Sequence, residues 1–221
     1  MNTIIVICEG QAEQEFCNSV LYPHFKDLGV TIASPVISVS NGGIVKWEVL
    51  KKEVLVYLIN NNRNTYITTF IDFYGLTGKG YPEHRIINNE NERRMLVSDI
   101  ETAMKNQIDD RYRYRFLPYI QLHEFETLIF TDISLLKDWY NPNEILDFNY
   151  LEETIRRYPD RELINDSPQT APSKRLIRAI PKYDKVALGN ILLMNIGLNR
   201  LRENNISFNN WIIKLESIRW N

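Results

Sequence analysis

Apolar runs alternate with amphipathic stretches through the first half of the chain. The runs that predict buried strands cover residues 3–8, 31–39, 65–72 and about 114–122. The stretches in which apolar residues recur three or four positions apart, and which therefore predict helices, cover 11–22, 43–60 and about 90–107. This βαβαβαβ order predicts the α/β class, with a mostly parallel four-stranded sheet flanked by helices.

After Phe130 the pattern changes to helical periodicity with no further strand. The predicted helices cover about 134–140, 150–158, 172–180, 184–197 and 207–218, and prolines interrupt them. We therefore divide the chain into an α/β domain, residues 1–132, and a helical C-terminal extension, residues 133–221, that packs on it.

Length and composition are those of a globular chain. The 221 residues, 44% of them hydrophobic, suffice for a sizeable core. The first apolar run is short and ends at Glu9, and no apolar stretch reaches membrane-spanning length, so we expect a cytoplasmic protein without membrane contact. The two cysteines, Cys8 and Cys17, lack the spacing of a zinc site and are expected to be buried thiols.

Charge is distributed unevenly along the chain. The net charge is -2, but residues 171–221 hold nine Lys or Arg against three Asp or Glu, which is +6 and leaves -8 for residues 1–170. A basic third beside an acidic part suits a nucleic-acid substrate held next to a metal site. Solvated helix faces are the plainer explanation of the same charges.

Carboxylates follow three of the predicted strands. Glu9 comes directly after the first strand, Asp72 ends the third, and Glu124 and Glu126 follow the fourth. Because ligands of open α/β sheets collect at the carboxyl ends of the strands, these side chains are expected to form one acidic pocket. Such a cluster needs a cation, and Mg²⁺ binds one or two carboxylates together with water and phosphate oxygens. The pattern predicts phosphoryl transfer, in which a metal activates water and an unligated Glu moves the proton.

The first two acids lie in motifs that resemble a known domain. Cys8-Glu9-Gly10 after one strand and Ile71-Asp72 after another are similar to the Toprim domain of topoisomerases, primases, OLD-type nucleases and ribosomal RNA maturases. The likeness is closer to a bacterial Toprim-like family that is often encoded beside ABC-type ATPases in phage-defence loci. Its marks are Glu9-Gly10-Gln11-Ala12-Glu13, residues 70–76 (FIDFYGL), residues 119–126 (YIQLHEFE) and residues 171–176 (APSKRL).

This resemblance implies roles for the acids. In Toprim enzymes the Glu of the first strand is the general acid or base and the acids after a later strand bind Mg²⁺, which gives these roles to Glu9 and Asp72. Toprim proteins usually have Asp-x-Asp at the second position, whereas this chain has Asp72-Phe73-Tyr74. Either Glu124 or Glu126 replaces the missing ligand, or the chain has kept the fold without the activity.

The sequence thus predicts a nuclease that uses Mg²⁺ or Mn²⁺ to hydrolyse RNA or DNA, acting as a defence-system effector. Its predicted catalytic residues are Glu9, Asp72 and Glu124, and its predicted metal ligands are Asp72, Glu124, Glu126 and Glu9. The alternative is a non-catalytic Toprim-like subunit that binds a partner ATPase or nucleic acid. Tyr74 favours this alternative, as would a Lys or Arg in the space between the acids. The sequence leaves a homodimer open.

Polar and basic residues between positions 123 and 185 are candidate substrate contacts. The predicted set is His123, Ser173, Lys174, Arg175, Lys182 and Lys185. A Ser before two cations at a helix start suits a phosphate, although an ordinary N-cap and a basic helix face explain the same residues. A lone His at a strand end is more often structural.

A second candidate contact with nucleic acid lies in residues 111–119. The basic and aromatic residues that interleave there are Arg111, Tyr112, Arg113, Tyr114, Arg115, Phe116 and Tyr119. Such interleaving occurs in platforms on which bases stack. Alternation with a period of two is also typical of a half-buried strand, so both interpretations stay open.

Overall fold

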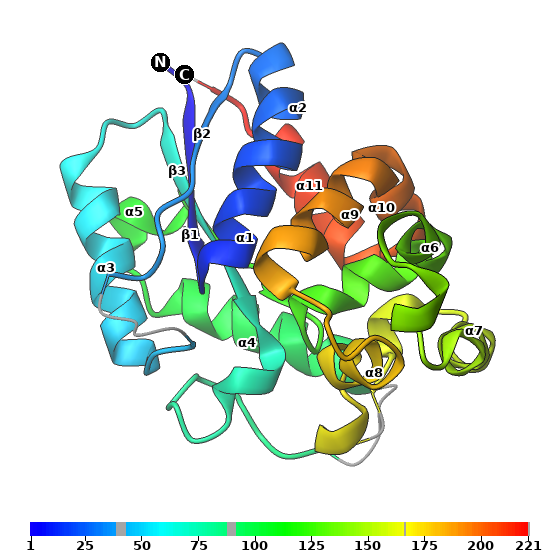
Figure 1. Cartoon of the computed structure of the whole chain (residues 1–221). Coiled ribbons are helices and arrows are strands. Elements are labelled where there is room, and N and C mark those ends of the chain that lie inside the picture. The colour runs from blue at the N-terminus through cyan, green and yellow to red at the C-terminus, as the bar shows by residue number, and fades with distance from the viewer. Residues whose placement is uncertain (39–42, 88–91, 166, 221) are drawn as a thin grey trace.

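A parallel sheet lies at the centre of the molecule (Figure 1). The computed structural model describes residues 1–38, 43–87, 92–165 and 167–220. The strands in these ranges are β1 (Thr3–Cys8), β2 (Thr31–Ala33), β3 (Thr65–Asp72), β4 (Phe116–Leu117) and β5 (Ile120–Gln121). Their order is β2-β1-β3-β4, β5 also pairs with β3, and every pairing is parallel, which confirms the predicted α/β class.

The second strand is shorter than the predicted 31–39. β2 ends at Ala33, and after it the chain joins β1 only through an isolated bridge between Val36 and Cys8. Pro35 lies between them and has no N–H to donate to the ladder, which accounts for the early end. Residue 39, the predicted end, lies outside the described residues.

The predicted strand 114–122 is divided into β4 and β5 by Pro118, which also lacks an N–H. At the break, the hydroxyl of Thr69 takes over the pairing with Tyr119. It donates to the Tyr119 carbonyl at 2.8 Å and accepts from the Tyr119 N–H at 3.0 Å. Both pieces therefore stay in parallel register with β3, and the four predicted strands become five.

Helices of the first half lie close to their predicted positions. They are α1 (Gln11–Phe16), the π-helical turn η1 (Cys17–Leu21), α2 (Tyr22–Asp27), α3 (Trp47–Asn60), α4 (Arg93–Asn106) and the single turn α5 (Asp110–Arg113). The first three are continuous and extend the predicted helix 11–22 to Asp27. α3 begins four residues later than predicted, and residues 90 and 91 of the predicted third helix lie outside the described residues.

No strand follows β5 in the described part of the second half, as predicted. The α-helices there are α6 (Leu136–Trp139), α7 (Phe148–Arg157), α8 (Pro172–Ala179), α9 (Asn190–Ile196), α10 (Leu198–Asn204) and α11 (Ile206–Glu216). The 3-10 helix η4 (Phe125–Thr131) follows β5, and the π-helical turn η9 (Lys185–Gly189) precedes α9, so the predicted helix 184–197 has two parts. None of the described helices is both long and apolar enough to cross a membrane.

Successive side chains of β1 point to opposite faces of the sheet. Ile4 and Val6 belong to an apolar cluster with α1 and the C-terminal helices α9, α10 and α11. Ile5 and Ile7 belong to a second cluster on the other face, where α3 and α4 cover the sheet. The sheet is thus the middle of three layers, and Figure 1 shows these helices on its two sides.

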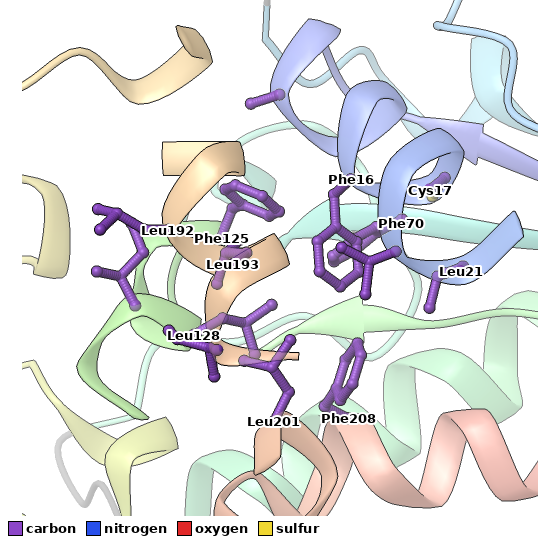
Figure 2. Close-up of a cluster of buried hydrophobic side chains, with 14 of the residues drawn as sticks. Phe16, Cys17, Leu21, Phe70, Phe125, Leu128, Leu192, Leu193, Leu201 and Phe208 are labelled. Carbon is purple, nitrogen blue, oxygen red and sulfur yellow. The ribbon is translucent and has the colours of Figure 1, made fainter. Parts of the chain in front are cut away.

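The C-terminal extension shares the first of these clusters with the sheet. Figure 2 shows Phe16 from α1, Phe70 from β3 and Phe208 from α11 meeting in it. Trp211 of α11 stacks on Tyr119 with ring centroids 4.3 Å apart, and its indole N–H donates to the Thr68 hydroxyl at 2.9 Å. The sheet and the extension therefore bury one continuous apolar core.

Candidate active site

Two adjacent strands deliver the first two acids of the site. Glu9 follows β1 directly, Asp72 is the last residue of β3, and β1 and β3 are hydrogen-bonded neighbours. The backbone N–H of Asp72 donates to Oε2 of Glu9 at 2.9 Å. The structure therefore brings these two predicted residues together and fixes the orientation of the Glu9 carboxylate.

Two further carboxylates join them from the elements that follow β1 and β5. Glu13 lies in the first turn of α1 and is 3% exposed, and Glu126 lies in η4 and is 2% exposed. Glu13 is part of a motif in the sequence but was not among the predicted site residues. Its spacing from Glu9 was the signal that could have identified it. Glu13 lies four positions after Glu9, in a helix that begins at the end of a strand, and helical side chains point back toward the start of their helix.

Lys185 lies beside these acids and forms ion pairs with two of them. Its Nζ lies 3.5 Å from Oε1 of Glu13 and 3.4 Å from Oε2 of Glu126, and 5.6 Å from the centroid of the Phe125 ring. The side chain is 38% exposed whereas the two acids are almost fully buried, so the ammonium group lies between the carboxylates and solvent. Glu9, Glu13, Asp72, Glu126 and Lys185 are called the acid cluster below.

The turn that carries Lys185 is fixed by its neighbours. Asp184 caps it, because its carboxylate accepts from the N–H groups of Val186 and Ala187, both at 2.9 Å. Gly189 ends the turn beneath Tyr183, and a side chain there would come within 2.9 Å of the Tyr183 hydroxyl. A π-helical turn at this position is thus stabilised from both ends, and such turns often occur at functional sites.

Burial and the repulsion of neighbouring carboxylates raise the pKa values of Asp72, Glu9 and Glu126. Burial raises the pKa of Asp72 well above its usual range, and Glu9, Glu13 and Glu126 raise it further, while Lys185 opposes them. Burial likewise raises the pKa of Glu9 and of Glu126. Burial alone would lower the pKa of Lys185, but the surrounding carboxylates outweigh it and raise the pKa. When all groups are ionised, four carboxylates and one ammonium leave three negative charges in a buried space.

Two oxygens of the cluster suit a divalent cation. Oδ1 of Asp72 and Oε2 of Glu126 are buried and accept no hydrogen bond from any described residue, although Oε2 of Glu126 is ion-paired with Lys185 at 3.4 Å. Carboxylate oxygens are the ligands that Mg²⁺ and Mn²⁺ take in proteins, so the chemistry of the donor set fits such an ion. In the present arrangement of the described residues, no three His, Cys, Asp or Glu side chains form a ready metal-binding group. Glu13 and Glu126 share the Lys185 ammonium instead.

Glu124, a predicted ligand and catalytic residue, faces another element. Its Oε2 accepts from the backbone N–H of Ser173 at 2.9 Å, at the start of α8. Glu124 therefore faces Ser173, whereas Glu126 faces Lys185. The N–H of Ser173, for which we had predicted a phosphate, donates to the Glu124 carboxylate instead. His123 between the strand and Glu124 adopts a positive φ of 63°, and this left-handed residue turns the chain after β5.

The remaining predicted substrate contacts are dispersed. His123 is buried, with its Nδ1 3.1 Å from Nδ2 of Asn165. Arg175 is 4% exposed, and its guanidinium donates to the Thr170 carbonyl at 2.7 Å and to side chains of α7, so it connects α7 with α8. Lys182 pairs with Glu144 at 3.1 Å in solvent, and Lys174 is exposed on α8. Of the predicted basic residues, Lys185 is the one that the structure places in the acid cluster.

Tyr74 is the residue at which the Toprim resemblance led us to expect a second Asp. Its side chain is 38% exposed, and its backbone N–H donates to the His123 carbonyl at 3.1 Å. Burial and the nearby Glu124 raise its pKa. Glu13 and Glu126, rather than this position, supply the additional carboxylates of the cluster.

Comparison with known proteins assigns the chain to a family. A family model described as a domain of unknown function, DUF4276, matches residues 8–216. The match includes every residue of the acid cluster. No curated protein and no solved structure matches the chain.

Proposed function

The chain belongs to the DUF4276 family, and we propose that it is a Mg²⁺- or Mn²⁺-dependent nuclease that hydrolyses phosphodiester bonds of RNA or DNA at the acid cluster. One observation carries the proposal. Three buried carboxylates, those of Glu13, Asp72 and Glu126, lie with the partly buried Glu9 around a single ammonium that pairs with Glu13 and Glu126, and Oδ1 of Asp72 has no hydrogen-bond donor among the described residues. A divalent cation would neutralise charge that is otherwise costly to bury. The Toprim resemblance of Glu9 and Asp72 supports the same function.

Each residue of the cluster has a role in this proposal. Asp72 and Glu126 would hold the cation, with Glu13 taking the place that we had predicted for Glu124. A bound Mg²⁺ or Mn²⁺ would stabilise charge on a phosphate oxygen and lower the pKa of water. Glu9 moves the proton, because burial raises its pKa and so favours the uptake of a proton. Lys185, next to solvent, attracts the phosphate anion.

The substrate class rests on charge. The C-terminal extension carries Lys185 of the acid cluster and, elsewhere on its surface, the exposed Lys174 and Lys182, the second of which pairs with Glu144. A chain of phosphates can contact several such cations at once, whereas a small phosphate ester cannot. A cytoplasmic location and a role as defence effector beside an ABC-type ATPase rest on the sequence alone and stay predictions.

Lys185 also favours a second candidate function. Its ammonium lies between Glu13 and Glu126, in the space where a metal-dependent enzyme would place a cation. Together with Tyr74 in place of an Asp, this arrangement is what a non-catalytic Toprim-like subunit would have, one that binds a partner ATPase or nucleic acid. The two candidates differ in whether a metal can displace or join Lys185.

Removing the Lys185 charge separates these candidates. With Lys185→Met in EDTA, we expect a loss of unfolding free energy of about 1–3 kcal/mol, less than for a fully buried charge because Lys185 is 38% exposed. If the cluster binds metal, millimolar Mn²⁺ restores the stability, since the cation replaces the missing charge. Thermal denaturation measures both values, and Lys174→Met, which removes an exposed lysine, is the control. Destabilisation that Mn²⁺ does not reverse would favour the non-catalytic subunit.

The raised pKa values predict how pH affects stability. Acids with a raised pKa in the folded state bind protons more tightly there, so their contribution to stability is present at low pH and is lost as pH rises through the raised values. Mn²⁺ competes with these protons. We therefore expect the increase in Tm on adding Mn²⁺ to be larger at about pH 8 than at about pH 6. An equal increase at both pH values would argue against binding at these acids.

Cleavage of defined substrates tests the proposed function. The purified full chain is incubated with end-labelled tRNA, single-stranded RNA or plasmid DNA in Mg²⁺, in Mn²⁺ or in EDTA. We expect at least one substrate to be cut with metal and none in EDTA, and the substrate that is cut identifies the target. Intact substrates in every metal, together with an unchanged Tm in Mn²⁺, would overturn the proposal.

A further inference from the structure

A pocket lies at the opposite end of β3 from the acid cluster. It has a volume of about 550 Å³ and is formed by the end of α3, the turn that leads into β3, and α5. Its lining includes Arg63, Arg111, Arg115, Tyr112, Tyr114 and Ile59. β3 runs from this pocket at Thr65 to the acid cluster at Asp72, so the two sites are about 20–25 Å apart. Figure 1 shows the N-terminus and the end of α11 on the side where β3 begins.

Arg115 gives this pocket a fixed positive charge. It is 3% exposed and donates to the carbonyls of Leu58 at 2.5 Å, Asn62 at 2.9 Å and Thr65 at 3.3 Å. These bonds use its terminal nitrogens, while its Nε has no acceptor among the described residues. Because a guanidinium stays ionised at all ordinary pH values, the wall of the pocket is cationic whatever the solution conditions.

Aromatic and aliphatic surface lies beside this charge. Tyr114 is 45% exposed and Ile59 is 59% exposed, so both offer apolar surface to solvent. The Tyr114 ring meets the Tyr66 ring edge-on with centroids 6.3 Å apart, and Tyr66 in turn meets Trp220 at 5.3 Å. A half-exposed aromatic ring is a surface on which a planar ligand can stack.

The charge of the rim favours an anion. Arg111 is 76% exposed, packs over the Tyr112 ring at 5.3 Å and pairs with Asp109 at 3.0 Å. Arg63 is exposed at the turn before β3. Three arginines against one carboxylate leave the pocket positive, which is the reverse of the acid cluster.

We propose that this pocket binds a nucleotide, with its base against Tyr114 and Ile59 and its phosphate against Arg63 and Arg111. Stacking on an aromatic ring beside guanidinium groups is how proteins hold single-stranded nucleic acid without reading its sequence. An acidic peptide would satisfy the arginines but would leave the apolar surfaces of Tyr114 and Ile59 in water. The choice of a nucleotide as the ligand rests in part on the proposed function. The arginines and aromatic rings of the pocket are observed independently of that function.

The structure divides residues 111–119 into a buried part and a surface part. Phe116 and Tyr119 are at most 2% exposed and belong to the core, as a half-buried strand requires. Tyr112 and Tyr114 stay at the surface beside Arg111. The interleaved pattern thus contains both a strand and, before it, a short basic and aromatic surface.

Binding in EDTA tests this site separately from cleavage. A fluorescein-labelled single-stranded RNA of about 12 nucleotides is titrated with the full chain and followed by anisotropy, and AMP is then added as competitor. We expect saturable binding that Tyr114→Ala and Arg63→Glu each weaken about fivefold or more, that Tyr114→Phe leaves near the wild-type value, and that high salt reduces. If AMP displaces the RNA, the pocket is a mononucleotide site. If the RNA binds and AMP does not displace it, the pocket is a site for a nucleic-acid strand.

The control is Arg156→Glu, which makes the same change of charge on exposed α7. A melting curve is recorded for each variant to check that it folds. Arg63 is exposed at a turn, so Arg63→Glu is expected to fold. If Tyr114→Ala does not fold, the RNA affinity of Arg63→Glu alone tests the proposal. The proposal is overturned if neither ligand binds, or if Arg63→Glu binds RNA as tightly as Arg156→Glu does. Since no metal is present in this assay, RNA binding here, combined with intact substrates and an unchanged Tm in Mn²⁺ in the metal assays, would keep this site and reject the nuclease.

Discussion

Glu9→Gln will lower metal-dependent cleavage by about 10²–10⁴-fold, which is the usual contribution of a general acid or base. Glutamine keeps the size of the side chain and an oxygen that can accept from the Asp72 N–H, so the hydrogen bond at 2.9 Å is retained. What is lost is the ability to take up and release a proton. Initial rates of cleavage of whichever substrate the wild type cuts measure the effect.

Stability distinguishes this loss from unfolding. Burial and neighbouring acids already raise the pKa of Glu9, so a neutral side chain there relieves repulsion, and we expect the Tm of Glu9→Gln in EDTA to equal or exceed that of the wild type. Glu15→Gln, on the exposed side of α1, is the matched control and should cleave normally. Glu9→Gln with wild-type activity would remove Glu9 from the mechanism.

The largest expected effect on stability belongs to Phe16→Ala. Phe16 has no exposed surface, and its ring meets those of Phe70, Phe125 and Phe208 edge-on, with centroids 5.7–5.9 Å apart (Figure 2). Truncation removes contacts to three elements at once and leaves a cavity, so we expect the free energy of unfolding to fall by about 3–5 kcal/mol. Urea denaturation measures the change.

The same substitution tests whether the sheet and the C-terminal extension unfold together. Phe70 and Phe125 come from the first 132 residues and Phe208 from the last helix, so the loss should appear as one shifted transition rather than two. Trp139→Ala, which truncates a side chain that is 48% exposed, should cost far less. A loss below about 1 kcal/mol for Phe16→Ala would contradict the packing described here.

Much of the sheet and part of the site could be predicted from the sequence. The alternation of apolar runs with amphipathic stretches predicted the parallel α/β class. The rule that the carboxyl ends of parallel strands meet at one edge of the sheet predicted that Glu9 lies near Asp72. The early end of β2 and the break between β4 and β5 were also predictable, since Pro35 and Pro118 lie inside the predicted strands and cannot donate to a ladder.

The rest of the site depends on contacts that no local pattern contains. His123 just before Glu124 has a left-handed backbone, and after it Glu124 accepts from Ser173 of α8 whereas Glu126 pairs with Lys185. The basic residues of 173–185 look alike in sequence. Arg175 is buried between helices, whereas Lys185 reaches Glu13 and Glu126, because the packing of α8 and η9 on the sheet separates them.

Calorimetric titration of Mn²⁺ into the wild type and Asp72→Asn, at about pH 8 where protons compete less for the acids, measures directly whether the acid cluster holds a metal. We predict saturable binding to the wild type that Asp72→Asn weakens about tenfold or more, because an amide side chain would offer the cation a neutral oxygen in place of a buried charge. Absence of binding to the wild type, or equal affinity of both proteins, would contradict a metal site at Asp72 and would leave Lys185 as the permanent counter-ion of the cluster.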